Sequence, residues 1–143
     1  MRTVKQLLDD KGRRVVAIAP EEPVLAAVQL MADNHIGAVL VMRGNQLVGI
    51  LSERDYARKV ILKGRSSSDT AAWEIMSAPV VTVGPHDTVN TCMRLMTDRR
   101  IRHLPVVEDD QVTGVLSIGD LIKAVIEEQQ QEIAQLQQYI TAG

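Results

Sequence analysis

An internal duplication constrains this chain more than any other feature of its 143 residues. The sequence aligns with itself without a gap from Val15 to Ile61 when it is shifted by 65 residues, so that Val15 falls on Val80. Repetition of this length indicates one structural unit built twice, in which the copies together bury a core. Identical pairs along the alignment are Pro20/Pro85, Val24/Val89, Leu30/Leu95, Met31/Met96, Asp33/Asp98, Ile36/Ile101, Val41/Val106, Gln46/Gln111, Gly49/Gly114, Ser52/Ser117 and Asp55/Asp120.

Both copies carry the same pattern of predicted elements. The runs "VVAIAP" and "VVTVGP" end at a proline and predict short strands, while "AVLVM" and "HLPVV" are typical of strands covered on both faces. Residues 22–35 and 87–100 predict helices, "RGNQ" and "EDDQ" predict hairpin turns, and further helices begin near Ser52 and Ser117. We therefore predict an α/β (α+β) fold of two βαββα repeats packed about a pseudo-two-fold axis, with clefts at the seam and a C-terminal helical extension. The apolar faces of the first helices are Val24, Val28 and Met31, and Val89, Met93 and Met96.

The segments outside the repeats complete a five-part organisation. Residues 1–14 form a lead-in with a short helix, 15–62 form repeat 1, and 63–79 form a linker whose brief helix is capped by Asp69. Residues 80–126 form repeat 2, and 127–143 form a helical tail. The tail suits packing against another helix, including one from a second subunit, and it is equally compatible with a solvated extension. Its narrow apolar stripe consists of Ile126, Ile133, Leu136 and Ile140.

Composition excludes several classes of function. A formal charge of −2 and a pI of 5.9 argue against a general nucleic-acid or membrane-surface binder. The longest apolar runs, such as "IGAVLVM", fall far short of the roughly 20 residues of a membrane helix. Cys92 is the single cysteine, which favours a reducing cytoplasm. The histidines and Cys92 show no metal-ligand spacing, and no nucleophile elbow or phosphate-binding loop occurs, so we expect neither a metal nor a catalytic residue.

The stretches "GILSERD" and "GVLSIGD" repeat a Ser-x-x-Asp motif that has two interpretations. As a structural motif, the serine caps a helix at about 0.5–2 kcal/mol, and the acid completes a capping box. As a binding motif, the helix N-terminus meets a phosphate and the carboxylate accepts both hydroxyls of a ribose. Two features favour binding. The usual box partner is Glu or Gln rather than Asp, and Gly49 and Gly114 lie in strands, where glycine often marks close approach by a ligand or another backbone.

The tandem unit, the two motifs and "IRHLPVV" resemble a pair of CBS (cystathionine β-synthase) domains over about Val15 to Ile126. The resemblance implies a non-catalytic regulatory module that binds an adenosine nucleotide (AMP, ADP, ATP or NAD) or S-adenosylmethionine between the repeats and signals by a change in packing. It also implies a homodimer and is compatible with an effector protein as a partner. The alternative is a ligand-free dimerisation or interaction scaffold in which the motifs are caps alone.

Site residues in the first cleft follow from this resemblance, position by position. Asp120 would bind the ribose, Ser117 would lie beside the phosphate, and Arg102 and His103 would present basic groups to that phosphate. The adenine would rest on the opposite repeat, near Val16, Ile36, Gly37 and Ala38.

The second cleft uses the equivalent residues of the other copy. Asp55 would bind the ribose, and Ser52 and Arg54 would lie near the phosphate. Gly119 stands where the first copy has Arg54, so charge is distributed unevenly and we expect unequal affinities. The base would be surrounded by Val81 and the backbone of Ile101, Arg102 and His103.

Overall fold

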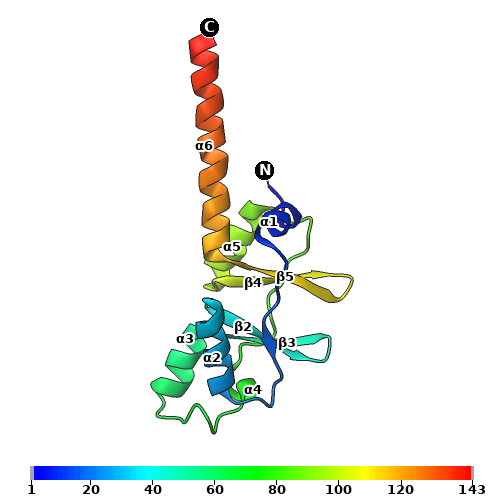
Figure 1. The fold of residues 1–143 in the computed structure, drawn as a ribbon, viewed down its shortest axis with the longest axis vertical. Coiled ribbons are helices and arrows are strands. Elements are labelled where there is room, and N and C mark those ends of the chain that lie inside the picture. Colours follow the sequence, from blue (N-terminus) through cyan, green and yellow to red (C-terminus); the bar gives the residue numbers. More distant parts are fainter. Residues whose placement is uncertain (1, 143) are drawn as a thin grey trace. The chain divides into compact units, whose positions relative to one another are not determined.

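The computed structural model describes residues 2–142 and has the predicted mixture of helices and short strands, ending in a C-terminal helix (Figure 1). The chain divides into two compact units, each built around one repeat. Unit 1 comprises residues 1–13, 82–108 and 113–143, and unit 2 comprises residues 14–81 and 109–112.

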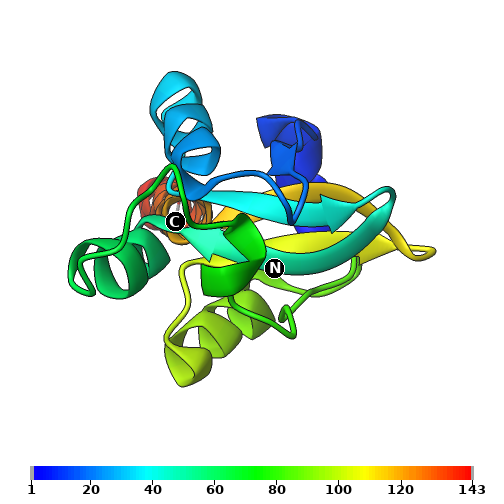
Figure 2. The same cartoon turned by 90° about the horizontal axis from the view of Figure 1, so that it is seen from below.

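Unit 2 contains repeat 1 and a three-stranded sheet in the order β1-β2-β3. Strand β1 (Ala17–Ile18) pairs in parallel with β2 (Ala38–Arg43), which pairs in antiparallel with β3 (Gln46–Ser52). The helices are α2 (Val24–Asn34), α3 (Glu53–Tyr56) with the π-helix η1 (Ala57–Ile61), and α4 (Ala72–Ile75), which lies against β3 (Figure 2). Their buried side chains form one core: Ile18, Val24, Ala27, Met31, Val39, Val41, Leu51, Val60, Ala72 and Ile75.

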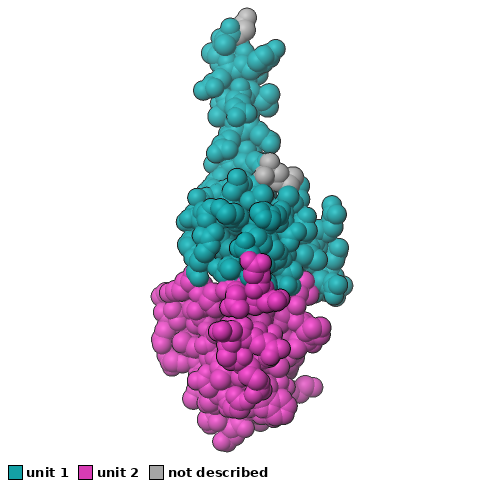
Figure 3. Space-filling model, turned by 90° about the vertical axis from the view of Figure 1, so that its right-hand side faces the viewer, with its two compact units in different colours: residues 1–13, 82–108, 113–143 teal, residues 14–81, 109–112 magenta. Residues whose placement is uncertain are grey.

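Unit 1 contains repeat 2 apart from residues 80–81 and 109–112, and it reproduces this plan. Strand β4 (His103–Glu108) pairs with β5 (Gln111–Ser117), and Val83 forms a parallel bridge to Val106, as Ile18 does to Val41 in repeat 1. The helices are α1 (Val4–Lys11), α5 (Val89–Arg99) and α6 (Ile118–Ala142). The C-terminal part of α6 extends away from the rest of unit 1 (Figure 3). Its predicted stripe is exposed in this single chain, from 48% at Ile126 to 76% at Ile140.

The two short helices that precede the repeats pack in crossed order. Helix α1 precedes repeat 1 in the sequence but packs on repeat 2, where the N–H of Val4 donates to the carbonyl of Asp87 at 2.8 Å. Helix α4 precedes repeat 2 but packs on repeat 1, where the N–H of Ala72 donates to the carbonyl of Glu22 at 2.8 Å. The core of each unit therefore includes the short helix that precedes the other repeat in the sequence. In unit 1 these buried side chains are Val4, Leu7 and Leu8 of α1.

The structure confirms the predicted βαββα elements and corrects some details. The N-cap of α4 is Ala71 rather than Asp69, because Glu74 reaches back to accept the N–H of Ala71 at 2.7 Å. The run "VVTVGP" contributes the isolated bridge of Val83 instead of a regular strand. Val28 and Met93 are only partly buried on their helices. Among residues 2–142, no helix has the length and apolarity needed to cross a bilayer.

Candidate functional site

Both Ser-x-x-Asp motifs form capping boxes. At the start of α6, the N–H of Asp120 donates to Ser117 Oγ at 3.2 Å, and the N–H of Ser117 donates to Asp120 Oδ2 at 2.8 Å. The same pair of bonds joins Asp55 and Ser52 at 3.2 and 3.0 Å. The capping interpretation is therefore confirmed in both copies. Asp takes the place of the usual Glu or Gln in both boxes, and from the third helical position its carboxylate reaches the N-cap amide.

Gly49 and Gly114, which occupy equivalent positions in the two repeats, each face a closely packed side chain of their own unit. A Cβ on Gly114 would lie 2.8 Å from Cδ2 of Leu8 in α1, and one on Gly49 would lie 2.7 Å from Cγ of Met76, the residue that follows α4. The close neighbour of each glycine is thus a side chain of the crossed lead-in helix or of the residue that follows it. The close approach at these two glycines is therefore made by side chains of the same unit and not by another backbone.

Asp120 is surrounded by donors that keep it ionised. The ammonium of Lys11, the last residue of α1, lies 2.5 Å from Asp120 Oδ2 and donates to the carbonyl of Val115 at 2.7 Å. Burial alone would raise the pKa of Asp120, but the hydrogen bonds from Lys11 and from the Ser117 amide outweigh it and leave the pKa below its usual value. The carboxylate is therefore charged at neutral pH and acts purely as an acceptor.

Two basic residues, Arg102 just before strand β4 and His103 at its start, lie near this carboxylate. The carbonyl of Arg102 accepts the N–H of Ile118 at 2.9 Å, which fixes the start of β4 at the N-terminus of α6. Burial, and then the charge of Lys11, lower the pKa of His103, while Asp120 opposes this shift. His103 is thus mainly neutral at pH 7. The structure brings together Ser117, Asp120, Arg102 and His103, four residues that the sequence assigned to one cleft.

In the corresponding site of unit 2, the carboxylate of Asp55 has more hydrogen-bond and ion-pair partners than that of Asp120. Oδ2 of Asp55 accepts from Ser52 Oγ at 3.0 Å in addition to the Ser52 amide. Oδ1 of Asp55 accepts from Ser77 Oγ at 3.1 Å and lies 3.0 Å from the ammonium of Lys59. These contacts use the roughly four acceptor positions of a carboxylate, whereas Asp120 within unit 1 accepts from Lys11 and from the amide and hydroxyl of Ser117.

The comparisons with known proteins agree with this duplicated architecture. The family model for the CBS domain matches residues 4–62 and again residues 72–127, so each match begins at the first residue of a lead-in helix.

The chain belongs to the CBS-domain family.

Similar proteins share this organisation as a CBS pair. The chain is 39% identical to the mitochondrial CBS domain-containing protein CBSX3 of Arabidopsis thaliana over 150 residues, covering 99% of this chain and 73% of that protein. A crystal structure of a CBS-domain protein is 50% identical, with a TM-score of 0.84, and covers 87% of this chain and 98% of its own. A protein with CBS domains from Burkholderia ambifaria MC40-6 is 46% identical, with a TM-score of 0.86, over 90% of this chain and 96% of its own.

A more distant neighbour was solved with ligands. It is the CBS domain pair of the protein MJ0100 in complex with 5′-methylthioadenosine and S-adenosyl-L-methionine, 21% identical with a TM-score of 0.80. The aligned region covers 90% of this chain and 98% of that one. At this identity the likeness supports the fold. CBS pairs are a family of regulatory modules that are generally non-catalytic.

Three of the adenine-contacting residues named from the sequence lie at or just before the start of β1 or β2. Val16 accepts the N–H of Leu40 at 3.0 Å through its carbonyl, Gly37 accepts that of Glu53 at 3.0 Å, and Ala38 pairs with Ser52 across β2 and β3. Contact of these residues with an adenine stays a prediction, as does that of the half-buried side chains of Ile36, Val81 and Ile101.

Three contacts to the two acids were not predicted from the sequence. Lys59 lies four residues after Asp55, a spacing at which opposite charges meet on a helix, so the pair could have been found. Lys11 and Ser77 reach their acids through tertiary packing, and no local pattern in the sequence indicates either contact.

Proposed function

We propose that this CBS pair is a non-catalytic regulatory module that binds an adenosine nucleotide (AMP, ADP, ATP or NAD), with Asp120 as the principal ribose acid. The observation that carries the proposal is the ionised carboxylate of Asp120 at the N-terminus of α6, beside Lys11, Arg102 and His103. A ribose offers two hydroxyl donors, and an ionised carboxylate is an acceptor without donors of its own. The acid and the sugar are therefore complementary.

The groups that bind the phosphate belong to the same unit as Asp120. Amides at the start of a long helix favour an anion, and α6 begins at Ile118 immediately after Ser117. Arg102, whose carbonyl accepts the N–H of Ile118, adds a permanent positive charge to the same site. His103 is mainly neutral without ligand, and a phosphate nearby would raise its pKa and favour its charged form.

The remaining parts of the sequence-based assignment belong to this proposal. Asp55, with Ser52 and Arg54, forms a second ribose-phosphate site. This site binds more weakly, because the Asp55 carboxylate already has four partners. The adenines contact the two sets of base residues predicted from the sequence. The protein is a cytoplasmic homodimer, and ligand occupancy changes how the repeats pack in a manner that a partner protein senses.

A second candidate function is a ligand-free interaction scaffold. The two capping boxes support it, because they give both aspartates a structural role without any ligand. The two functions make different predictions. The regulatory module binds a nucleotide and loses affinity when an acid is replaced, whereas the scaffold binds no nucleotide.

Replacing Asp120 with asparagine should weaken nucleotide binding at least tenfold, with a smaller loss for Asp55→Asn. A charge-assisted hydrogen bond contributes about 1.5–3 kcal/mol, and the neutral amide loses it while its oxygen still accepts the Ser117 amide. Isothermal titration with AMP, ADP, ATP, NAD and S-adenosylmethionine measures the effect. Asp98→Asn, an exposed change on α5, is the matched control.

Two outcomes would contradict the proposal. Wild-type protein that binds none of the five ligands at millimolar concentration would favour the scaffold. Equal affinity of wild type and Asp120→Asn would remove Asp120 from the site.

A further inference from the structure

Lys11 is attached at two points in unit 1. Its ammonium donates to the carbonyl of Val115 at 2.7 Å and lies 2.5 Å from Asp120 Oδ2. A lysine ammonium carries three N–H donors, and these two contacts use two of them. The side chain is 40% exposed, so the amine is fixed in place and still accessible to a ligand at Asp120.

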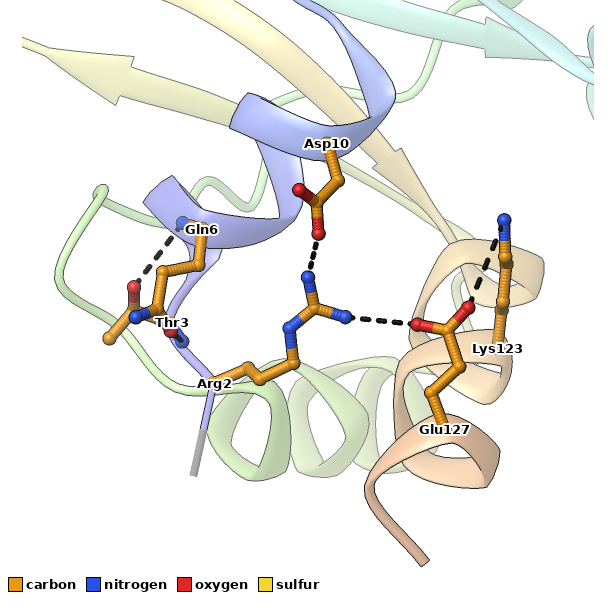
Figure 4. Close-up of polar contacts among 6 residues, drawn as sticks. All are labelled: Arg2, Thr3, Gln6, Asp10, Lys123 and Glu127. Carbon is orange, nitrogen blue, oxygen red and sulfur yellow. Dashed lines mark hydrogen bonds and ion pairs between the residues drawn. The ribbon is translucent and has the colours of Figure 1, made fainter. Parts of the chain in front are cut away.

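Helix α1 is fastened to α6 at both of its ends. Arg2, which precedes α1, contacts Asp10 of α1 and Glu127 of α6, the latter at 3.1 Å (Figure 4). Lys11 makes the second connection, to Asp120. Asp120 and Glu127 are seven residues apart and share one face of α6, because seven residues make about two helical turns. The buried Leu7 and Leu8 hold α1 between these connections. The position of Lys11 is therefore determined by the fold and not by one ion pair.

The chemistry of the Lys11–Asp120 pair suits a sugar hydroxyl. A hydroxyl both donates and accepts a hydrogen bond, a carboxylate only accepts, and an ammonium only donates. Asp120 can therefore accept the proton of a ribose hydroxyl while Lys11 donates to the oxygen of that hydroxyl. From this geometry we infer that Lys11 is a ligand-binding residue of the Asp120 site, which it completes from outside the repeat; the inference rests on the proposed nucleotide-binding function.

The contact of Lys11 with Val115 indicates that Lys11 assists the ribose and does not compete with it for Asp120. A lysine attached to Asp120 alone would have to leave before a ribose could bind, and its removal would then tighten binding. The Val115 carbonyl holds the Lys11 ammonium independently of Asp120, so the ribose can join the pair without displacing the amine. In unit 2 the cation beside Asp55 is Lys59, from η1, which directly continues the helix that carries the acid. The two sites thus obtain their cations from different parts of the chain.

The test compares Lys11→Met with Lys5→Met, which removes the same charge from the same helix at an exposed pair with Asp9. AMP affinity, measured by titration calorimetry, should fall about tenfold in Lys11→Met and stay unchanged in Lys5→Met. Lys11→Arg keeps a donor and should restore most of the affinity. Lys11→Met should also shift the acid-side loss of affinity to higher pH, because Asp120 loses the donor that lowers its pKa, while Arg102 and His103 remain.

The results separate this inference from the proposed function. If wild type and Lys5→Met bind AMP and Lys11→Met binds it equally well or more tightly, the role of Lys11 is wrong and nucleotide binding stands. If wild type itself does not bind AMP, both are wrong for this nucleotide. NMR titration of the Asp120 carboxyl without ligand gives an independent reading: its pKa should rise in Lys11→Met, and an unchanged value would overturn the assignment.

Discussion

Replacing Leu8 with alanine should lower the free energy of unfolding by about 3 kcal/mol, since Leu→Ala changes at buried sites cost about 2–5 kcal/mol. Leu8 is 1% exposed and packs against the backbone at Gly114 within unit 1. The loss combines the burial of the side chain with the cavity that the shorter one leaves. Urea denaturation followed by circular dichroism measures it.

The control for this change is Leu136→Ala on α6. Leu136 is 62% exposed, and surface substitutions usually change stability by less than about 0.5 kcal/mol. A loss below 1 kcal/mol for Leu8→Ala would mean that α1 is not part of the core of unit 1. The crossed packing of the lead-in helix would then be wrong.

Adding a methyl group at Gly49 or Gly114 should destabilise the protein by about 1–3 kcal/mol, the usual cost of overpacking a core. The new Cβ at Gly49 would lie 2.7 Å from Cγ and 3.1 Å from Cβ of Met76, and the latter atom cannot move without the backbone. At Gly114 the new Cβ meets the two methyl groups of Leu8, the nearer at 2.8 Å. We therefore expect Gly49→Ala to cost more than Gly114→Ala.

A double variant separates steric overlap from other effects of losing glycine. In the Leu8→Ala background the methyl groups that meet Gly114 are gone, so Gly114→Ala should then cost much less than in wild type. The coupling energy from this cycle should fall within the 0.5–3 kcal/mol seen for residues in contact. Costs that simply add would indicate that Leu8 is not the neighbour of Gly114. Gly12→Ala is unsuitable as a control because of its φ of 102°.

The duplication and the hydrophobic patterns predict most of the fold, because strand, helix and hairpin signals are local. The parallel pairing of Ile18 with Val41 and of Val83 with Val106 preserves the 65-residue shift that is visible in the sequence. The crossed packing of α1 and α4 could not be predicted in this way. It depends on which sheet edge each helix covers, and no local periodicity encodes that choice.

The sequence predicts the candidate site only in part, because some of its contacts depend on tertiary packing. The Ser-x-x-Asp motifs identify Asp55 and Asp120 because cap and acid are three residues apart. Lys11 and Asp120 are 109 residues apart in sequence, and only the folded chain brings them together. The two glycines illustrate the reverse case: a glycine within a strand indicated close approach by a ligand or another backbone, and in the structure a leucine and a methionine side chain pack there.

The most direct test of ribose recognition by the two aspartates compares AMP with 2′-deoxy-AMP by titration calorimetry. The two ligands share base and phosphate and differ by one hydroxyl, and a site that hydrogen-bonds this hydroxyl discriminates against the ligand that lacks it. We expect wild type to bind AMP at least tenfold more tightly than 2′-deoxy-AMP, and Asp55→Asn/Asp120→Asn to lose this preference. Equal affinity of wild type for the two ligands would contradict the account.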